Sequence, residues 1–187
     1  SYHVDVTTGI DAEFIIPARS VDELIKTLVP GPARLALDGG QLTVASGGTT
    51  LNLKRMDGTF PDYQRVIPQA FPVNVTLAPQ RLAEAVARVA VMADKSANHR
   101  VDLFIKDGVL RITAEGSFGR AQEAIDVLQE GTEDEIALAY NAKYLADAVG
   151  PVVGDLQLRF SGTTSPSVLR DLGDPAYLAM VVPLRTG

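Results

Sequence analysis

Residues that could carry out chemistry are sparse in this chain of 187 residues. The sequence has two histidines and no cysteine, which disfavours thiolate chemistry, a disulfide or a histidine-rich metal site. It contains no glycine-rich phosphate loop with its lysine and no G-x-S-x-G nucleophile turn. GSFG, residues 116–119, matches a short nucleic-acid-binding pattern, but so short a match arises readily by chance. The sequence therefore disfavours an enzyme and predicts no cofactor.

The acidic residues also fit structural roles better than catalytic ones. Asp57, Asp62, Asp94 and Asp107 fall in predicted turns or loops, where aspartate commonly accepts backbone hydrogen bonds. The more unusual segment is GTFPDYQRVIP, residues 58–68, which joins two predicted strands. It carries prolines, aromatic residues and an arginine where a simple connection would be smaller and more polar.

Composition and charge restrict the class of protein further. The chain is 46% hydrophobic and 21% charged, as in water-soluble globular proteins, and no apolar run is long enough to cross a membrane. Its net charge of −6 argues against a protein that coats nucleic acid along its whole surface, although a local basic face remains compatible with it. The lack of cysteine permits a reducing compartment.

A repeated pattern organises the sequence. Three segments each predict a strand, a short helix and three further strands, and their helix positions recur at offsets of about 61 and 63 residues, as expected for a repeated supersecondary unit. Ser20, with Glu23 three residues later, predicts a helix N-cap, and Asp107-Gly108 predicts a hairpin turn. We therefore predict an α+β fold of repeated βαβββ units with mostly antiparallel sheets, in which the three short helices share one side of the sheets. The apolar helix positions are Val21, Leu24 and Ile25, then Leu82, Ala85 and Val86, then Leu145, Ala148 and Val149.

Four motifs in order carry a family resemblance: FPDYQRVIP, DGVLRITAE, NAKYLADAV and the C-terminal YLAMVVPLR. Together they resemble the β subunit of bacterial DNA polymerase III, the sliding clamp. The resemblance covers nearly all of this chain but only about half of a clamp, which has three similar domains. It implies that residues 1–70 are the second half of the middle domain and residues 71–187 the last domain. We therefore expect the chain to be a fragment.

The resemblance implies a function that the residues alone do not show. Clamps form a head-to-tail homodimeric ring around double-stranded DNA, with antiparallel sheets outside and short helices on the inner side. The ring does not read the DNA sequence, and it tethers the polymerase in the cytoplasm. Their partners are the polymerase III alpha subunit, the clamp loader and repair polymerases, which bind through short peptide motifs. The DNA-directed DNA polymerase activity, which is classed as a nucleotidyltransferase or transferase activity, belongs to the holoenzyme. We therefore expect no catalysis from this subunit.

Site residues follow from the same resemblance. In the family, the FPDYQRV segment and the C-terminal strand form the walls of an apolar groove for those peptides. The sequence departs from the family at three of these places. His3 stands where arginine is common in the family, and Asn98 stands where some members have an aromatic residue. The given sequence ends in Thr186 and Gly187, where some members have a large apolar residue. The implied groove residues are Tyr2, His3, Val4, Pro61, Arg65, Val66, Asn98, Asn141, Tyr144, Thr164, Pro166, Met180, Val182, Pro183, Leu184 and Arg185.

Two further sets are implied by the ring. The residues expected to face DNA are Arg19, Lys26, Arg81, Arg88 and Lys143, and those expected at the dimer interface are Met92, Gln122 and Glu123. From the residue pattern alone, solvated helix surfaces and ordinary packing remain simpler interpretations of these positions. A truncated clamp paralogue that binds peptides without being loaded on DNA is the alternative function.

Overall fold

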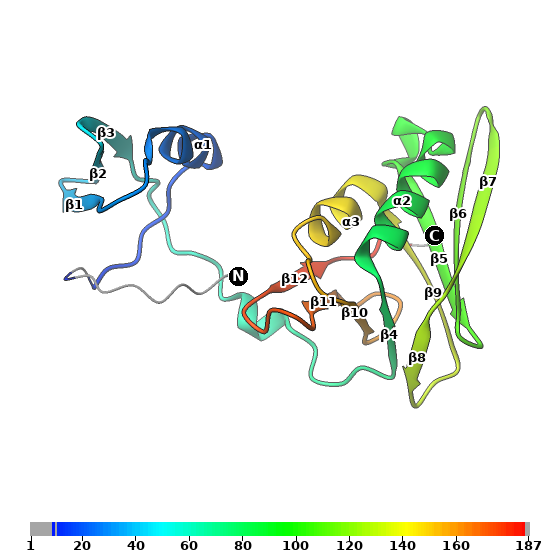
Figure 1. The fold of residues 1–187 in the computed structure, drawn as a ribbon. Coiled ribbons are helices and arrows are strands. Elements are labelled where there is room, and N and C mark those ends of the chain that lie inside the picture. The colour runs from blue at the N-terminus through cyan, green and yellow to red at the C-terminus, as the bar shows by residue number, and fades with distance from the viewer. Residues whose placement is uncertain (1–8, 10, 186–187) are drawn as a thin grey trace. The chain divides into compact units, whose positions relative to one another are not determined.

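The structure, a computed structural model, describes residue 9 and residues 11–185. Contacts within the chain divide it into two units, Asp5–Asp62 and Tyr63–Gly187, here called the N-terminal and C-terminal units. Their elements are shown in Figure 1. The domain boundary near residue 70 remains a prediction. The alternating pattern of SYHVDV, residues 1–6, is typical of a strand, but these residues lie outside the described part of the chain.

The C-terminal unit contains both complete repeats. The first consists of β4 (Val73–Leu77), α2 (Pro79–Val89), β5 (Arg100–Lys106), β6 (Val109–Gly116) and β7 (Gly119–Asp126). The second consists of β9 (Glu135–Asn141), α3 (Ala142–Val149), β10 (Leu156–Phe160), β11 (Ser167–Asp171) and β12 (Leu178–Val181). The sequence predicted these elements, but it missed β8 (Leu128–Gly131), which follows the first repeat.

The two repeats exchange their first strands. The order of one antiparallel sheet is β12-β11-β10-β4-β8, so β4 of the first repeat pairs with β10 of the second. The order of the other is β7-β6-β5-β9, so β9 of the second repeat pairs with β5 of the first. The predicted α+β class is confirmed, because relatives with the sliding-clamp fold match this structure and the sheets are antiparallel.

Helices α2 and α3 lie side by side against the sheets (Figure 1). Each buries the side predicted from its spacing: Leu82, Ala85 and Val86 in α2, Leu145 and Val149 in α3. Their partners come from alternating core positions on β4, β5, β6, β9 and β10. One continuous core therefore joins both repeats.

Asp171 is a buried acid whose carboxylate is satisfied by backbone N–H groups. Its carboxylate accepts backbone N–H bonds from Val153 (2.9 Å), Gly154 (3.1 Å) and Gly173 (2.8 Å). The hydrogen bond from Val153 contributes most to lowering the pKa of Asp171, and the other backbone bonds lower it further. A Cβ at Gly154 would lie 2.6 Å from the carboxylate, so this close approach requires glycine there.

The N-terminal unit is only a partial repeat. It contains α1 (Ala18–Thr27) and a three-stranded sheet of β1 (Arg34–Asp38), β2 (Gln41–Ser46) and β3 (Thr49–Lys54). The strand predicted before the helix of this first segment is wrong, because residues 14–17 form only an isolated bridge between Ile15 and Met56. Among the described residues its core is small, with Leu42, Val44 and Leu53 buried.

The predicted cap of α1 is also wrong. The helix begins at Ala18, two residues before Ser20, and the N-cap position is Pro17, with no side-chain cap. Glu23 pairs with Lys26 at 2.8 Å instead of reaching back to the cap. Proline favours this start because it fixes φ and places the chain ready for a first helical turn. The hairpin prediction is confirmed, since Asp107 and Gly108 both have positive φ between β5 and β6.

Equivalent apolar positions in the repeats predict different stability effects. Leu82 of α2 is fully buried, whereas Val21, its counterpart in α1, is 36% exposed. Leu82→Ala should therefore lower the free energy of unfolding of the C-terminal unit by about 2–5 kcal/mol, while Val21→Ala should change stability by roughly 1 kcal/mol or less. Urea titration of both variants measures this. Equal losses would contradict the difference in packing.

Candidate functional site

A cavity of about 440 Å³ lies at the β12 edge of the five-stranded sheet. Strand β12 and the chain that follows supply most of its lining, and the start of α3 supplies the rest. The structure thus brings together six of the predicted groove residues and adds Val181, which the sequence analysis missed. The lining consists of Asn141, Tyr144, Met180, Val181, Val182, Pro183 and Leu184.

The tail that lines this cavity is held in place by backbone bonds and burial. Val181 pairs with Ser167 at the end of β12. The Leu184 N–H then donates to the Ala139 carbonyl at 2.7 Å, which ties the tail to β9. Pro183 is buried between these two anchors, while Val182 is 65% exposed. The tail therefore offers an apolar surface whose backbone is bonded to the rest of the C-terminal unit.

Asn141 organises the other side of the cavity. Its side-chain oxygen accepts from the N–H groups of Lys143 (2.9 Å) and Tyr144 (3.3 Å), which caps α3. Its side-chain nitrogen donates to the Asn98 carbonyl at 2.7 Å. One amide thus fixes both the start of the helix and the loop beside it.

The loop at Asn98 has an unusual backbone. Asn98 and His99 both have positive φ, 55° and 50°, which only a few per cent of non-glycine residues adopt. The His99 carbonyl accepts from the Ala142 N–H at 2.9 Å, so the loop is bonded to the start of α3 twice. Asn98 is therefore held next to the cavity wall, although it is not among the residues that line it.

Two tyrosines near the cavity have opposite roles. Tyr140 is buried and its hydroxyl shares a hydrogen bond with Ser167. Burial raises the pKa of Tyr140, so it stays neutral and serves packing. Tyr144 is 64% exposed although it lines the cavity. An exposed aromatic side chain at an ordered apolar surface is suited to contact a ligand.

The remaining predicted groove residues are not brought to this cavity within the C-terminal unit. Arg65 and Val66 are exposed in the short helix η1 (Tyr63–Val66), and Arg185 is exposed just beyond the tail. Thr164 and Pro166 lie in the loop between β10 and β11. Pro61 belongs to the N-terminal unit, and Tyr2, His3 and Val4 lie outside the described residues.

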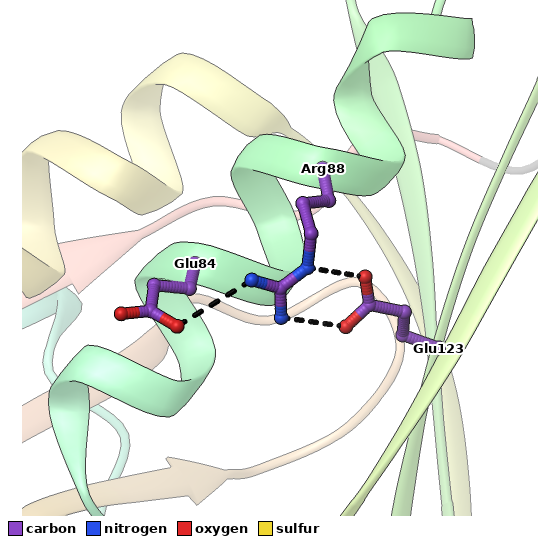
Figure 2. Close-up of polar contacts among 3 residues, drawn as sticks. All are labelled: Glu84, Arg88 and Glu123. Atoms are coloured by element: carbon purple, nitrogen blue, oxygen red, sulfur yellow. Dashed lines mark hydrogen bonds and ion pairs between the residues drawn. The ribbon is translucent and has the colours of Figure 1, made fainter.

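The basic residues predicted to face DNA differ in how their charge is compensated. Arg88 donates to both carboxylate oxygens of Glu123, at 2.6 and 2.9 Å, and also to Glu84 at 3.4 Å (Figure 2). The bond to Glu123 raises the pKa of Arg88 and lowers that of Glu123. In the N-terminal unit, Lys26 pairs with Glu23. Those without an ion pair among the described residues are Arg19, Arg81 and Lys143, all exposed.

The predicted interface residues cluster around edge strand β7 and the end of α2. Glu123 is on β7 and is joined to Arg88, whereas Gln122 is exposed beside it. Met92 is partly buried against the core, so much of its apolar surface is used within the chain; its neighbour Val91 is 74% exposed. Their role at an interface remains a prediction.

The structure explains two motifs without catalysis. Asp94 accepts bonds from the N–H and hydroxyl of Ser117, both at 2.9 Å, so it anchors the GSFG turn. A Cβ at Gly116 would overlap the Met92 carbonyl, which accounts for that glycine. Among the described residues, no group of three or more His, Cys, Asp or Glu could hold a metal ion, and no helix has the length and apolar character to cross a membrane.

Comparison with known proteins places this arrangement in a family. Residues 64–185 match the family model described as DNA polymerase III beta subunit, C-terminal domain. The chain is 32% identical over 181 residues to the beta sliding clamp of Synechococcus elongatus, covering 94% of this chain and 46% of the relative. It is 37% identical over 142 residues to that of Caulobacter vibrioides, covering 74% and 37%.

Solved structures agree with the sequence relatives. A sliding clamp from Pseudomonas aeruginosa, solved bound to griselimycin, matches with a TM-score of 0.85 at 25% identity, over 92% of this chain and 47% of that one. The C. crescentus beta sliding clamp matches with a TM-score of 0.85 at 28% identity, over 96% and 48%. The chain belongs to the bacterial DNA polymerase III beta subunit family, the beta sliding clamps. It spans about half the length of the relatives it matches.

Two neighbouring side chains at the cavity should differ in how much they contribute to the stability of the fold. Asn141→Ala removes the cap of α3 and should lower the free energy of unfolding by about 1 kcal/mol. Tyr144→Ala should leave thermal unfolding nearly unchanged, because the ring is mostly exposed. Thermal melts followed by circular dichroism test both. A large loss of stability in Tyr144→Ala would assign that ring to packing.

Proposed function

We propose that this chain is the peptide-binding and DNA-facing part of a sliding clamp, the processivity factor of a bacterial replicative polymerase. The observation that carries the proposal is the ordered cavity at Met180–Leu184 in a chain of the beta sliding clamp family. Its partners would be the polymerase III alpha subunit, the clamp loader and repair polymerases of the bacterial cytoplasm. In the full-length protein, two protomers would close a ring around duplex DNA.

The chemistry of the cavity suits short linear peptides with apolar or aromatic anchors. Its walls are largely apolar, and its polar groups are the side-chain amide of Asn141 and the hydroxyl of Tyr144. Because Pro183 is buried and Leu184 is bonded to β9, little of the wall must become ordered on binding. Pre-organisation of this kind lowers the entropic cost of association. Arg65 and Val66, in η1 of the C-terminal unit, would extend the groove.

The charge distribution suits binding to DNA by enclosure. A net charge of −6 opposes tight binding to free duplex, but a ring needs only local contacts with phosphates. Arg81 and Lys143, exposed on α2 and α3, are the best candidates in the C-terminal unit. Arg88 should contribute less, because two carboxylates already compensate its charge.

Two other functions, an enzyme and a clamp paralogue that is not loaded on DNA, make different demands on the molecule. We expect no enzymatic activity, because the acids considered for chemistry have structural partners or lie in turns, as Asp94 does. A clamp paralogue that binds peptides but is not loaded on DNA would share the cavity. Peptide binding without any DNA contact from the α2 and α3 surface would favour the paralogue.

Peptide binding at the cavity is the direct test. A labelled synthetic peptide with adjacent Leu and Phe anchors should bind the chain with a dissociation constant of the order of micromolar. Tyr144→Ala and Val182→Ala should each weaken binding about tenfold, because they remove exposed apolar contacts from the cavity wall. Fluorescence anisotropy titrations measure these constants.

Val153→Ala is the matched control for that test. Val153 is 87% exposed but lies on a different surface, so its removal should leave peptide affinity unchanged. Thermal melts show whether each variant is folded. Equal affinity in the intact chain and both cavity variants would argue against the groove.

DNA binding should be weak and sensitive to salt. Without a closed ring, this chain should hold linear duplex only through phosphate contacts, and raising the salt concentration should remove it. Lys143→Gln should weaken binding further and reduce the salt slope by roughly one, whereas Arg111→Gln on β6 should not. Electrophoretic mobility shifts at several salt concentrations measure this. Tight, salt-resistant binding would contradict enclosure as the basis of DNA association.

A further inference from the structure

Two arginines lie near each other on the face of the five-stranded sheet that points away from the core. On β10, Leu156, Leu158 and Phe160 are buried while Gln157 and Arg159 alternate with them. Arg170 on β11 lies directly opposite Gln157, and Arg159 opposite Val168. Arg159 and Arg170 are therefore diagonal neighbours on the same face, a separation that long side chains can bridge. Partial burial, and to a lesser degree the proximity of Arg170, lower the pKa of Arg159.

This pair lacks an acidic partner. Arg159 donates to the Asn74 side-chain oxygen at 3.3 Å, and its guanidinium lies 4.0 Å from the centre of the Phe71 ring. Among the residues that the structure describes, neither arginine forms an ion pair. Glu130 shares the row with Arg159 but lies beyond Asn74, two strands away. The contact with the Phe71 ring and the hydrogen bond to Asn74 hold the Arg159 guanidinium in place. Its terminal N–H groups form no ion pair with a carboxylate among the described residues.

The same face carries one residue of the peptide cavity, although Val168, which lies between that residue and the arginines, is buried. Met180, which lines the cavity, pairs with Val168, and Val168 pairs with Arg159. Met180 and Arg159 thus lie in one row, separated by two strand spacings, or about 10 Å. An extended peptide advances about 3.3 Å per residue. A ligand with an apolar residue at Met180 would place a side chain about three positions away near the arginines.

We propose that Arg159 and Arg170 form a carboxylate-binding site for an acidic residue of the same peptide whose apolar anchors occupy the cavity. The partner is therefore a peptide with an aspartate or glutamate about three positions from its apolar anchor. This inference rests on the proposed peptide groove and adds a charge requirement to it. Arginine suits the role because its planar fork can donate two parallel bonds to one carboxylate.

The test compares two peptides that differ only in one group. Both carry the Leu-Phe anchor, and one has Glu three positions away where the other has Gln. The intact chain should bind the Glu peptide about three- to tenfold more tightly, and the preference should shrink at high salt. Arg170→Gln and Arg159→Lys should each reduce this preference towards unity without weakening the Gln peptide. Arg111→Gln, which removes one positive charge on β6, should retain the full preference.

Each outcome separates this site from the groove. If neither peptide binds the intact chain, the proposed groove fails and this site with it. If both bind equally in the intact chain, or if Arg111→Gln lowers the preference as much as Arg170→Gln does, only the carboxylate site is overturned. A short DNA duplex that loses affinity for folded Arg170→Gln, with the peptide preference unchanged, would assign the pair to phosphate and overturn the inference. Thermal melts confirm that the variants are folded.

Discussion

The exchange of first strands between two repeats is the constraint on which the C-terminal unit depends. Strand β4 completes the sheet of the second repeat, and β9 completes that of the first. Neither repeat can therefore bury its sheet alone, and both helices must lie over one shared core. The cavity inherits its rigidity from this arrangement, because the Leu184 N–H is bonded to Ala139 of the exchanged strand β9.

The N-terminal unit shows what a repeat looks like without that exchange. Helix α1 has the same apolar spacing as α2, yet none of its residues is buried, and Ile25 is 64% exposed. The difference cannot come from local sequence, because both helices are amphipathic and similar in length. Helix α2 packs against α3 and against β6 and β7 of the four-stranded sheet, whereas α1 packs against β3. An uncovered apolar face of this kind is prone to association.

The sequence predicted the repeat and its helices because apolar spacing and hairpin turns are local signals. It did not predict the start of α1, since Ser20 has the chemistry of a cap but Pro17 sets the backbone two residues earlier. It also missed β8, whose pairing with β4 depends on a partner over 50 positions away in sequence (about the length of a repeat). The cavity residues came from family resemblance. Val181 and the Arg159–Arg170 pair needed the strand register, which only the structure provides.

Native-state hydrogen exchange tests the strand exchange most directly. If the two repeats complete each other, amides of β4, β5, β9 and β10 should open together, with one free energy equal to that of global unfolding of the C-terminal unit. Amides of β1–β3 should exchange with a smaller free energy, because their core is small. Separate opening of β4 with β10 and of β9 with β5 would contradict the shared core and the rigid cavity built on it.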